Sequence, residues 1–240
     1  AQRTHGWSAV DVSATPSIAA TLLDGGDYDP PGQMDPPTAR VTSTGMVRAS
    51  WEPVPPAARG EGALPAIGYR MVVRRVRQAG SSEEKEDTFI GEIETQAGFD
   101  SCNVAGLVDG NTYVFFVAAR NAVGEGPMSA ASDELKFVRQ PARPGRPRLV
   151  SVTGTAVQVE WDPVDGRGAT LTGYQLIRRN PHDADEEPVP VDAFPPDTTR
   201  VLLTADDLPS PFVPFELVLF AVTSVGQSKP SKALLVEPPA

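Results

Sequence analysis

Residues 107–126 constrain the fold of this chain more than any other stretch. The turn-forming residues 109–111 (Asp-Gly-Asn) are followed by apolar side chains at every second position, namely Tyr113, Phe115, Val117 and Ala119. A period of two places side chains on one face of a β-strand. The intervening residues are apolar too, which predicts a central strand covered on most of its length. Asn121 and Gly124 predict the turn that ends it.

The spacing around this strand resembles that of a known family. Leu107 lies six residues before Tyr113, as at the tyrosine corner of β-sandwiches, where the tyrosine hydroxyl bonds to nearby backbone. Residues at fixed offsets resemble the F strand and F–G loop of a fibronectin type III domain: Leu107, Thr112, Tyr113, Val117, Ala119, Asn121, Gly124, Gly126 and Pro127. The resemblance implies an all-β fold and protein binding through loops or sheet edges.

A weaker copy of the same pattern occupies the C-terminal part of the chain. Residues 157–163 match residues 47–53, and in both a tryptophan is followed by an acid and a proline. A repeat of roughly 100–110 residues suits consecutive domains rather than a solenoid. With the resemblance, this predicts two fibronectin type III-like, immunoglobulin-like seven-stranded β-sandwiches in tandem. Trp51 and Trp161 are expected between their sheets.

The expected division of the chain follows from these copies. Residues 1–35 are either the end of an upstream repeat or an irregular extension, and residues 24–37 have the Asp, Gly and Pro content of a linker. We expect the first domain over 36–140 and the second over 141–240. The proline-rich junction 140–148 predicts a short, stiff connection.

Within the first domain, a charged turn and two strands can be placed in more detail. The turn is expected at 81–87, followed by a strand at 88–93, and the last strand of the domain at 132–138. In the second domain Phe215 replaces the corner tyrosine, and Leu208 lies seven residues before it with three prolines between. We therefore expect a corner without the hydroxyl bond.

Composition limits the classes of partner. The net charge of −10 argues against nucleic acid as the main partner. No apolar run is long enough to insert directly into a membrane. The single cysteine, Cys102, excludes an intramolecular disulfide. The free thiol and the absence of an Asn-x-Ser/Thr sequon favour an intracellular scaffold of the cytoskeleton or cilium, with the cell surface or secretion as the alternative.

Few residues are candidates for chemistry. His5 falls in the N-terminal tail and His182 in a loop, and neither sits beside a serine and an acid. Cys102 is expected to be a buried, inert thiol. The acidic run 183–187 lacks the glycine and spacing of a calcium loop and is interpreted as a solvated hairpin tip. We predict no catalytic residue, no cofactor and no metal site.

A group of arginines on the expected C strands is the main candidate for binding. Its members are Arg70, Arg74, Arg75, Arg77, Arg178 and Arg179. They form either a basic stripe that meets an acidic partner or one half of cross-strand pairs with acids such as Glu92 and Glu94. No Arg-Gly-Asp occurs, and residues 165–167 (Asp-Gly-Arg) have the reverse order, so an integrin-like site is not predicted.

Two functions are compatible with these observations. The first is a non-catalytic segment of a larger multidomain protein that acts as spacer and protein-binding scaffold, of the cytoskeletal, ciliary or cell-adhesion type. Its partners would be other proteins. The alternative is an accessory module of a secreted carbohydrate-active enzyme. An enzyme within this chain would require a deep polar pocket with perturbed ionisable groups.

Overall fold

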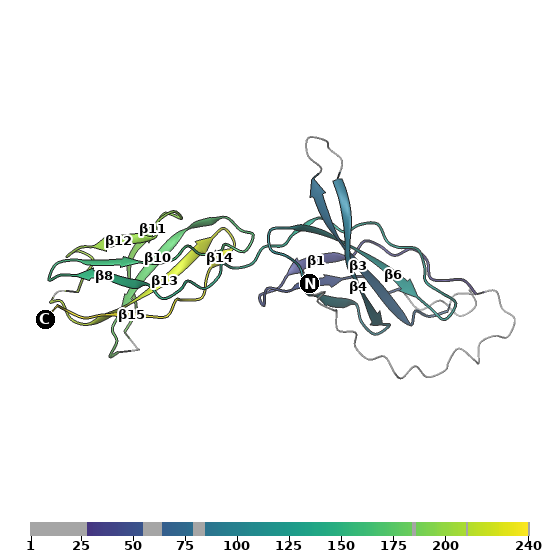
Figure 1. Ribbon diagram of the computed structural model, residues 1–240. Coiled ribbons are helices and arrows are strands. Elements are labelled where there is room, and N and C mark those ends of the chain that lie inside the picture. The colour runs from purple at the N-terminus through teal and green to yellow at the C-terminus, as the bar shows by residue number, and fades with distance from the viewer. Residues whose placement is uncertain (1–27, 55–63, 79–84, 184–185, 210, 240) are drawn as a thin grey trace, which may run out of the picture.

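The computed structural model describes residues 28–54, 64–78, 85–183, 186–209 and 211–239. Every element in these ranges is a β-strand, and all strand pairs are antiparallel. The strands form two sandwiches that lie end to end (Figure 1). The expected all-β class is therefore confirmed.

The first sandwich contains β1 (Thr38–Val41), β2 (Val47–Ser50), β3 (Gly68–Gln78), β4 (Lys85–Gln96), β5 (Ser101–Val104), β6 (Thr112–Arg120) and β7 (Leu135–Lys136). One sheet has the order β1-β2-β5 and the other β4-β3-β6-β7. The expected turn at 81–87 is too long, because β4 already begins at Lys85. The paired ends of β3 and β4 project from the body of this sandwich (Figure 1).

The second sandwich repeats this order. It contains β8 (Arg148–Val152), β9 (Val157–Glu160), β10 (Leu171–Arg179), β11 (Val189–Phe194), β12 (Arg200–Leu203), β13 (Phe215–Thr223), β14 (Gly226–Gln227) and β15 (Leu234–Val236). One sheet is β12-β9-β8, and the other is β11-β10-β13-β14 with β15 also paired to β13. The short β14 is an addition to the seven expected strands.

Each core is centred on a tryptophan against a tyrosine. Trp51 and Tyr69 are buried with their ring centroids 5.4 Å apart, and Trp161 and Tyr174 with theirs 5.5 Å apart. Trp161 has a further aromatic neighbour, because the centroid of Phe194 lies 6.0 Å away. The expectation that both tryptophans lie between the sheets is confirmed.

The corner before β6 has the hydroxyl bond that the sequence predicts. The Tyr113 hydroxyl accepts a hydrogen bond from the Val108 N–H at 2.9 Å. In the second sandwich the buried Phe215 makes no such bond. There the Arg178 guanidinium donates to the Asp207 carbonyl oxygen at 2.8 Å, and Leu208 is buried beneath the corner. A side chain from β10 thus replaces the tyrosine as the tie to this loop.

The last strand of the first sandwich is shorter than the expected 132–138. Only Leu135–Lys136 forms a regular strand. Before it, Ser129 and Ser132 lie three residues apart, and their hydroxyls accept the β6 N–H groups of Val117 and Phe115, each at 3.0 Å. Residues three apart cannot both occupy positions of a regular β-ladder, which repeats every two residues. The serine hydroxyls therefore accept the β6 N–H groups that a regular partner strand would have paired.

Segments before the first strand of each sandwich have the same burial pattern. In both segments every third residue is buried. These residues are Pro31, Met34 and Pro37 before β1, and Pro141, Pro144 and Pro147 before β8. Burial of every third residue is typical of a polyproline II helix. Met34 packs in the first core, so the interpretation of residues 24–37 as a linker outside the core is wrong at this position. The reason is that residues around it lie along the β6–β7 connection, where Gln33 donates to the Met128 carbonyl.

Candidate functional site

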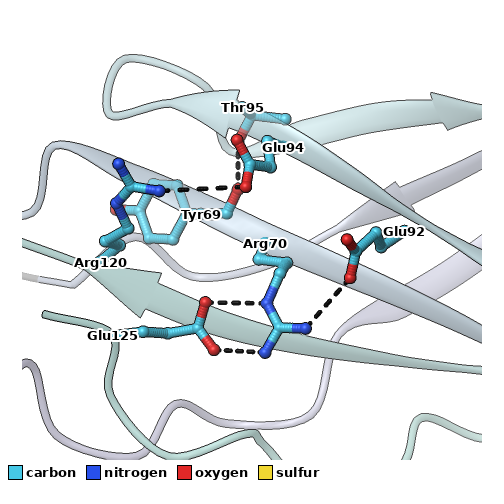
Figure 2. A network of polar contacts seen from close by, with 7 residues as sticks. All are labelled: Tyr69, Arg70, Glu92, Glu94, Thr95, Arg120 and Glu125. Atoms are coloured by element: carbon cyan, nitrogen blue, oxygen red, sulfur yellow. Dashed lines mark hydrogen bonds and ion pairs between the residues drawn. The ribbon is translucent and has the colours of Figure 1, made fainter. Parts of the chain in front are cut away.

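One arginine of β3, Arg70, is paired with acids on neighbouring segments, as the alternative of cross-strand pairing predicts. Figure 2 shows the Arg70 guanidinium between two carboxylates. It donates to Glu125 Oε2 at 2.8 Å through Nε and to Glu125 Oε1 through Nη2, and it pairs with Glu92 on β4 at 3.1 Å. Glu94 pairs instead with Arg120 on β6, at 3.9 Å. Cross-strand pairing is therefore confirmed for Glu92, whereas Glu94 has a partner that was not expected.

The other arginines of the first stripe face different surroundings. The Arg74 guanidinium lies over the Phe116 ring, 5.1 Å from its centroid. Arg75 is partly buried opposite Tyr113, and its Nε has no hydrogen-bond partner among the described residues. Arg77 is exposed. The four arginines of β3 therefore have different surroundings, and Arg70 is the one with two carboxylate partners among the described residues.

In the second sandwich the corresponding arginines are also engaged. Arg179 pairs with Glu216 on β13 at 2.6 Å, and Arg178 donates to the Asp207 carbonyl. These contacts are separated from those of β3 because the two sandwiches lie end to end (Figure 1). The structure therefore does not bring the six arginines together in one basic face.

The Arg70–Glu125 pair predicts a measurable titration shift. A hydrogen bond from Arg70, with a smaller contribution from the Arg120 charge, holds the pKa of the Glu125 carboxyl below its usual value. Stability from this pair is present above the unfolded pKa of the carboxyl and is lost as the pH falls through its lower folded pKa. Because both groups are partly exposed, we expect Glu125→Gln to cost at most about 1 kcal/mol.

Carboxyl titration by NMR checks this expectation. Arg70→Gln should raise the pKa of Glu125 towards the ordinary glutamate range, whereas Arg40→Gln, on the opposite sheet, should leave it unchanged. An unaltered Glu125 titration in Arg70→Gln would contradict the assignment of Arg70 as the main cause.

The remaining candidates show no arrangement for catalysis. His182 is exposed in a turn, and His5 lies outside the described residues. Cys102 is partly buried against the first core, and burial raises its pKa to about 11, so its thiolate is a minor species near neutral pH. Glu186 bonds to Asn180, and the described ranges contain no group of three His, Cys, Asp or Glu side chains placed to hold a metal.

An open hollow of about 450 Å³ lies on the second sandwich. Its lining is Thr172, Gly173, Tyr174, Gln175, Ala193, Phe194, Pro195 and Val222. No Asp, Glu, His, Lys, Arg or Cys side chain is among these lining residues, and the Tyr174 hydroxyl accepts a hydrogen bond from the Val164 N–H at 3.1 Å. Within the described ranges there is also no helix with the length and hydropathy needed to cross a membrane.

A close contact between the two sandwiches is the most specific arrangement outside the cores. The turn at 165–168 of the second sandwich meets the turn at 109–110 of the first. Gly168 has a φ of +82°, and a Cβ placed on it would lie 2.7 Å from the Gly110 Cα and nearer still to its nitrogen. Only glycine fits a position with both this backbone conformation and this contact. We call this contact, together with the Arg139 interactions below, the joint.

Arg139 connects the joint to both sandwiches. Its Nε and Nη2 atoms donate to Oδ1 and Oδ2 of Asp109, at 2.7 and 2.6 Å. Its backbone N–H donates to the Arg167 carbonyl oxygen at 3.1 Å. Three residues later, the Ala142 N–H donates to the Asp165 carbonyl at 2.9 Å. No contact of the turn at 165–168 with another domain was predicted from the sequence. Its only local signal was two glycines within four residues.

Comparison with known proteins gives a family match for the first sandwich and relatives for longer parts of the chain. Residues 29–134 match the family model of the fibronectin type III domain. Contactin-2 of Mus musculus is 30% identical over 156 residues, which are 64% of this chain and 14% of that protein. Protein sidekick-2 of Mus musculus is 29% identical over 128 residues, 53% of this chain and 5% of that protein.

A longer match includes most of the chain. The neuronal cell adhesion molecule of Rattus norvegicus is 28% identical over 223 residues, 90% of this chain and 17% of that protein. The crystal structure of the chicken CNTN1 FN1-FN3 domains aligns with a TM-score of 0.36 and 16% identity, over 89% of this chain and 69% of that one. The chain thus spans less than a fifth of each of the three relatives. Residues 29–134 thus match the fibronectin type III domain, and the second sandwich repeats the strand order of the first.

Proposed function

We propose that this chain is a non-catalytic segment of a larger cell-surface protein, in which it acts as a spacer and a protein-binding scaffold of the adhesion type. The observation that carries the spacer role is the joint. A flexible connection would leave the backbone groups of residues 139–142 to water, whereas here two of their N–H groups bond to the second sandwich. The Arg139–Asp109 ion pair ties the same segment to the first.

The cell-surface location is favoured by the relatives. One of them is named a neuronal cell adhesion molecule. The earlier preference for an intracellular scaffold is not supported, because its two reasons do not determine the compartment. A sandwich held by Trp–Tyr cores needs no disulfide, and lack of a sequon in one segment says little about the whole protein. The role as an accessory module of a carbohydrate-active enzyme stays a prediction.

An adhesion assay tests the binding role. Beads coated with the chain are expected to attach to cultured neural cells more than beads coated with the heat-denatured chain. Attachment should be lost when proteins on the cells are removed with trypsin and should persist after glycosidase treatment. Equal attachment of native and denatured chain, or attachment that survives trypsin, would contradict a protein-binding role at the cell surface.

A further inference from the structure

The outward face of the β1-β2-β5 sheet carries two arginines opposite each other. The register pairs Arg40 on β1 with Arg48 on β2, and Asn103 on β5 completes the same rung. Both arginines are exposed. Like charges directly opposite each other on antiparallel strands are destabilising. The two opposed arginines therefore do not stabilise the fold. The chain contains more acidic than basic residues, yet neither arginine is placed opposite an acid.

These two arginines also lack the acid partners that their counterparts have. Among the described residues, no carboxylate lies within ion-pair distance of Arg40 or Arg48. The Arg48 guanidinium donates to the Ser101 hydroxyl at 2.8 Å, and that hydroxyl donates onward to Asp100 at 2.9 Å. Arg48 thus lies along the sheet surface. A guanidinium has five N–H donors, so the N–H groups that Ser101 does not use can donate to an acceptor on a partner molecule.

In the equivalent sheet of the second sandwich, two arginines on the outward face bind one carboxylate. There Glu160 on β9 lies between Arg148 on β8 and Arg200 on β12, at 3.3 and 2.7 Å. Hydrogen bonds from Arg200 and then Arg148 lower the pKa of Glu160. The position corresponding to Glu160 in the first sandwich, one residue before the core tryptophan, is Ser50. The next rung of the first sheet has arginines on one outer strand and on the middle strand, and its third member is Asn103, so the rung contains no carboxylate.

We propose that the outward face of β1-β2-β5 binds an acidic segment of a partner protein, one of whose carboxylates bridges Arg40 and Arg48 as Glu160 bridges Arg148 and Arg200. We call this face the Arg40–Arg48 face. The neighbouring rung on one side consists of Thr38, Ser50 and Ser101, which offer hydroxyls, and the exposed Met46 lies on the other side. Such a surface suits a polar, extended peptide. This inference rests on the proposed protein-binding role and names the surface and the partner chemistry.

The negative charge of the whole chain does not prevent this contact. At physiological ionic strength, charges separated by more than about 8 Å are largely screened. The electrostatic energy of a partner carboxylate at hydrogen-bond distance is therefore determined mainly by the two guanidinium groups. The distant acids of the chain mainly lower the association rate of the partner. Binding through this face should accordingly weaken as salt is added.

A labelled peptide tests the proposal. The probe is a fluorescein-labelled peptide of alternating Glu and Thr, with the Gln–Thr peptide as its control, and binding to the full chain is followed by fluorescence polarisation at low ionic strength. We expect Arg40→Gln/Arg48→Gln to weaken binding of the acidic peptide by about 5- to 30-fold. The matched variant Arg148→Gln/Arg200→Gln removes the same charge from arginines that are already paired and should leave binding within about two-fold.

The possible outcomes separate the surface from the general function. Equal weakening in both double variants, or no weakening in Arg40→Gln/Arg48→Gln, overturns the proposed face. Dependence on Arg40 and Arg48 for a heparin oligosaccharide but not for the peptide overturns the choice of an acidic protein. If native beads attach to cells and Arg40→Gln/Arg48→Gln beads attach equally, protein binding stands and this face fails. If the peptide result holds but no beads attach, the face stands and the adhesion role fails.

A measurement without any ligand checks the premise. Arg40→Glu places a carboxylate opposite Arg48, removes no described hydrogen bond, and should raise the thermal midpoint of the first sandwich by roughly 1–5 °C. An unchanged or lower midpoint would show that the two arginines do not oppose each other in solution and would overturn the proposal.

Discussion

Replacing Trp161 with alanine is expected to lower the free energy of unfolding of the second sandwich by about 3–5 kcal/mol. The indole is buried between the sheets and contacts the rings of Tyr174 and Phe194, so truncation leaves a cavity and removes two aromatic contacts. Trp51→Ala should cost the first sandwich somewhat less, because Thr95 occupies the place corresponding to Phe194 in the strand register.

Hydrogen exchange of individual amides measures this effect in each sandwich separately. The slowest amides of β9, β10 and β13 should lose protection in Trp161→Ala, while those of β2, β3 and β6 keep theirs. Leu202→Ala is the control, since that side chain is 58% exposed and should change stability by less than about 0.5 kcal/mol. Retained protection in β10 of Trp161→Ala would contradict a core centred on this residue.

Gly168→Ala is expected to open the joint while both sandwiches stay folded. The added Cβ would meet the Gly110 backbone, and the φ of +82° costs an alanine about 1–2 kcal/mol. The clash is relieved if the two turns separate, whereas the φ penalty stays within the turn at 165–168 and lowers the stability of the second sandwich slightly. The sandwiches should then reorient independently, which shortens the rotational correlation time that NMR relaxation reports for each.

Gly154→Ala is the matched control for the joint. Nothing lies within 4 Å of the position that a Cβ on Gly154 would occupy, and this glycine belongs to a turn of the same sandwich. It should leave the correlation times and the small-angle scattering profile unchanged. If Gly168→Ala gives the same profile as the wild type, the joint does not set the angle between the sandwiches and the spacer role loses its main support.

The features predicted well from sequence are those determined by neighbouring residues. Tyr113 follows a turn and leads an alternating strand, and the two tryptophans stand in matching local patterns. These signals predicted the cores and the first corner. Met34 was missed because its burial depends on a contact with the β6–β7 connection, far away in the chain. No local period indicates such a contact.

The candidate binding residues were harder to predict for a similar reason. Arginines on β3 looked like a stripe because they are close in sequence, but Glu125, which neutralises Arg70, comes from a loop more than fifty residues away. Arg40 and Arg48 are eight residues apart, and no pattern in the sequence singles them out as a pair. They become opposite only once the turn between β1 and β2 fixes the register. Pairing across strands, which composition does not reveal, decides which charges remain available.

The spacing of Pro141, Pro144 and Pro147 has a consequence for how arrays of this kind could vary in length. A polyproline II helix turns by about 120° per residue. Deleting one residue between 141 and 147 would rotate the second sandwich by about a third of a revolution about the axis of the connector. Deleting three residues would shorten the connector but keep the original rotational orientation of the second sandwich. Length changes in such connectors should therefore be tolerated in threes wherever the downstream unit must face a fixed direction.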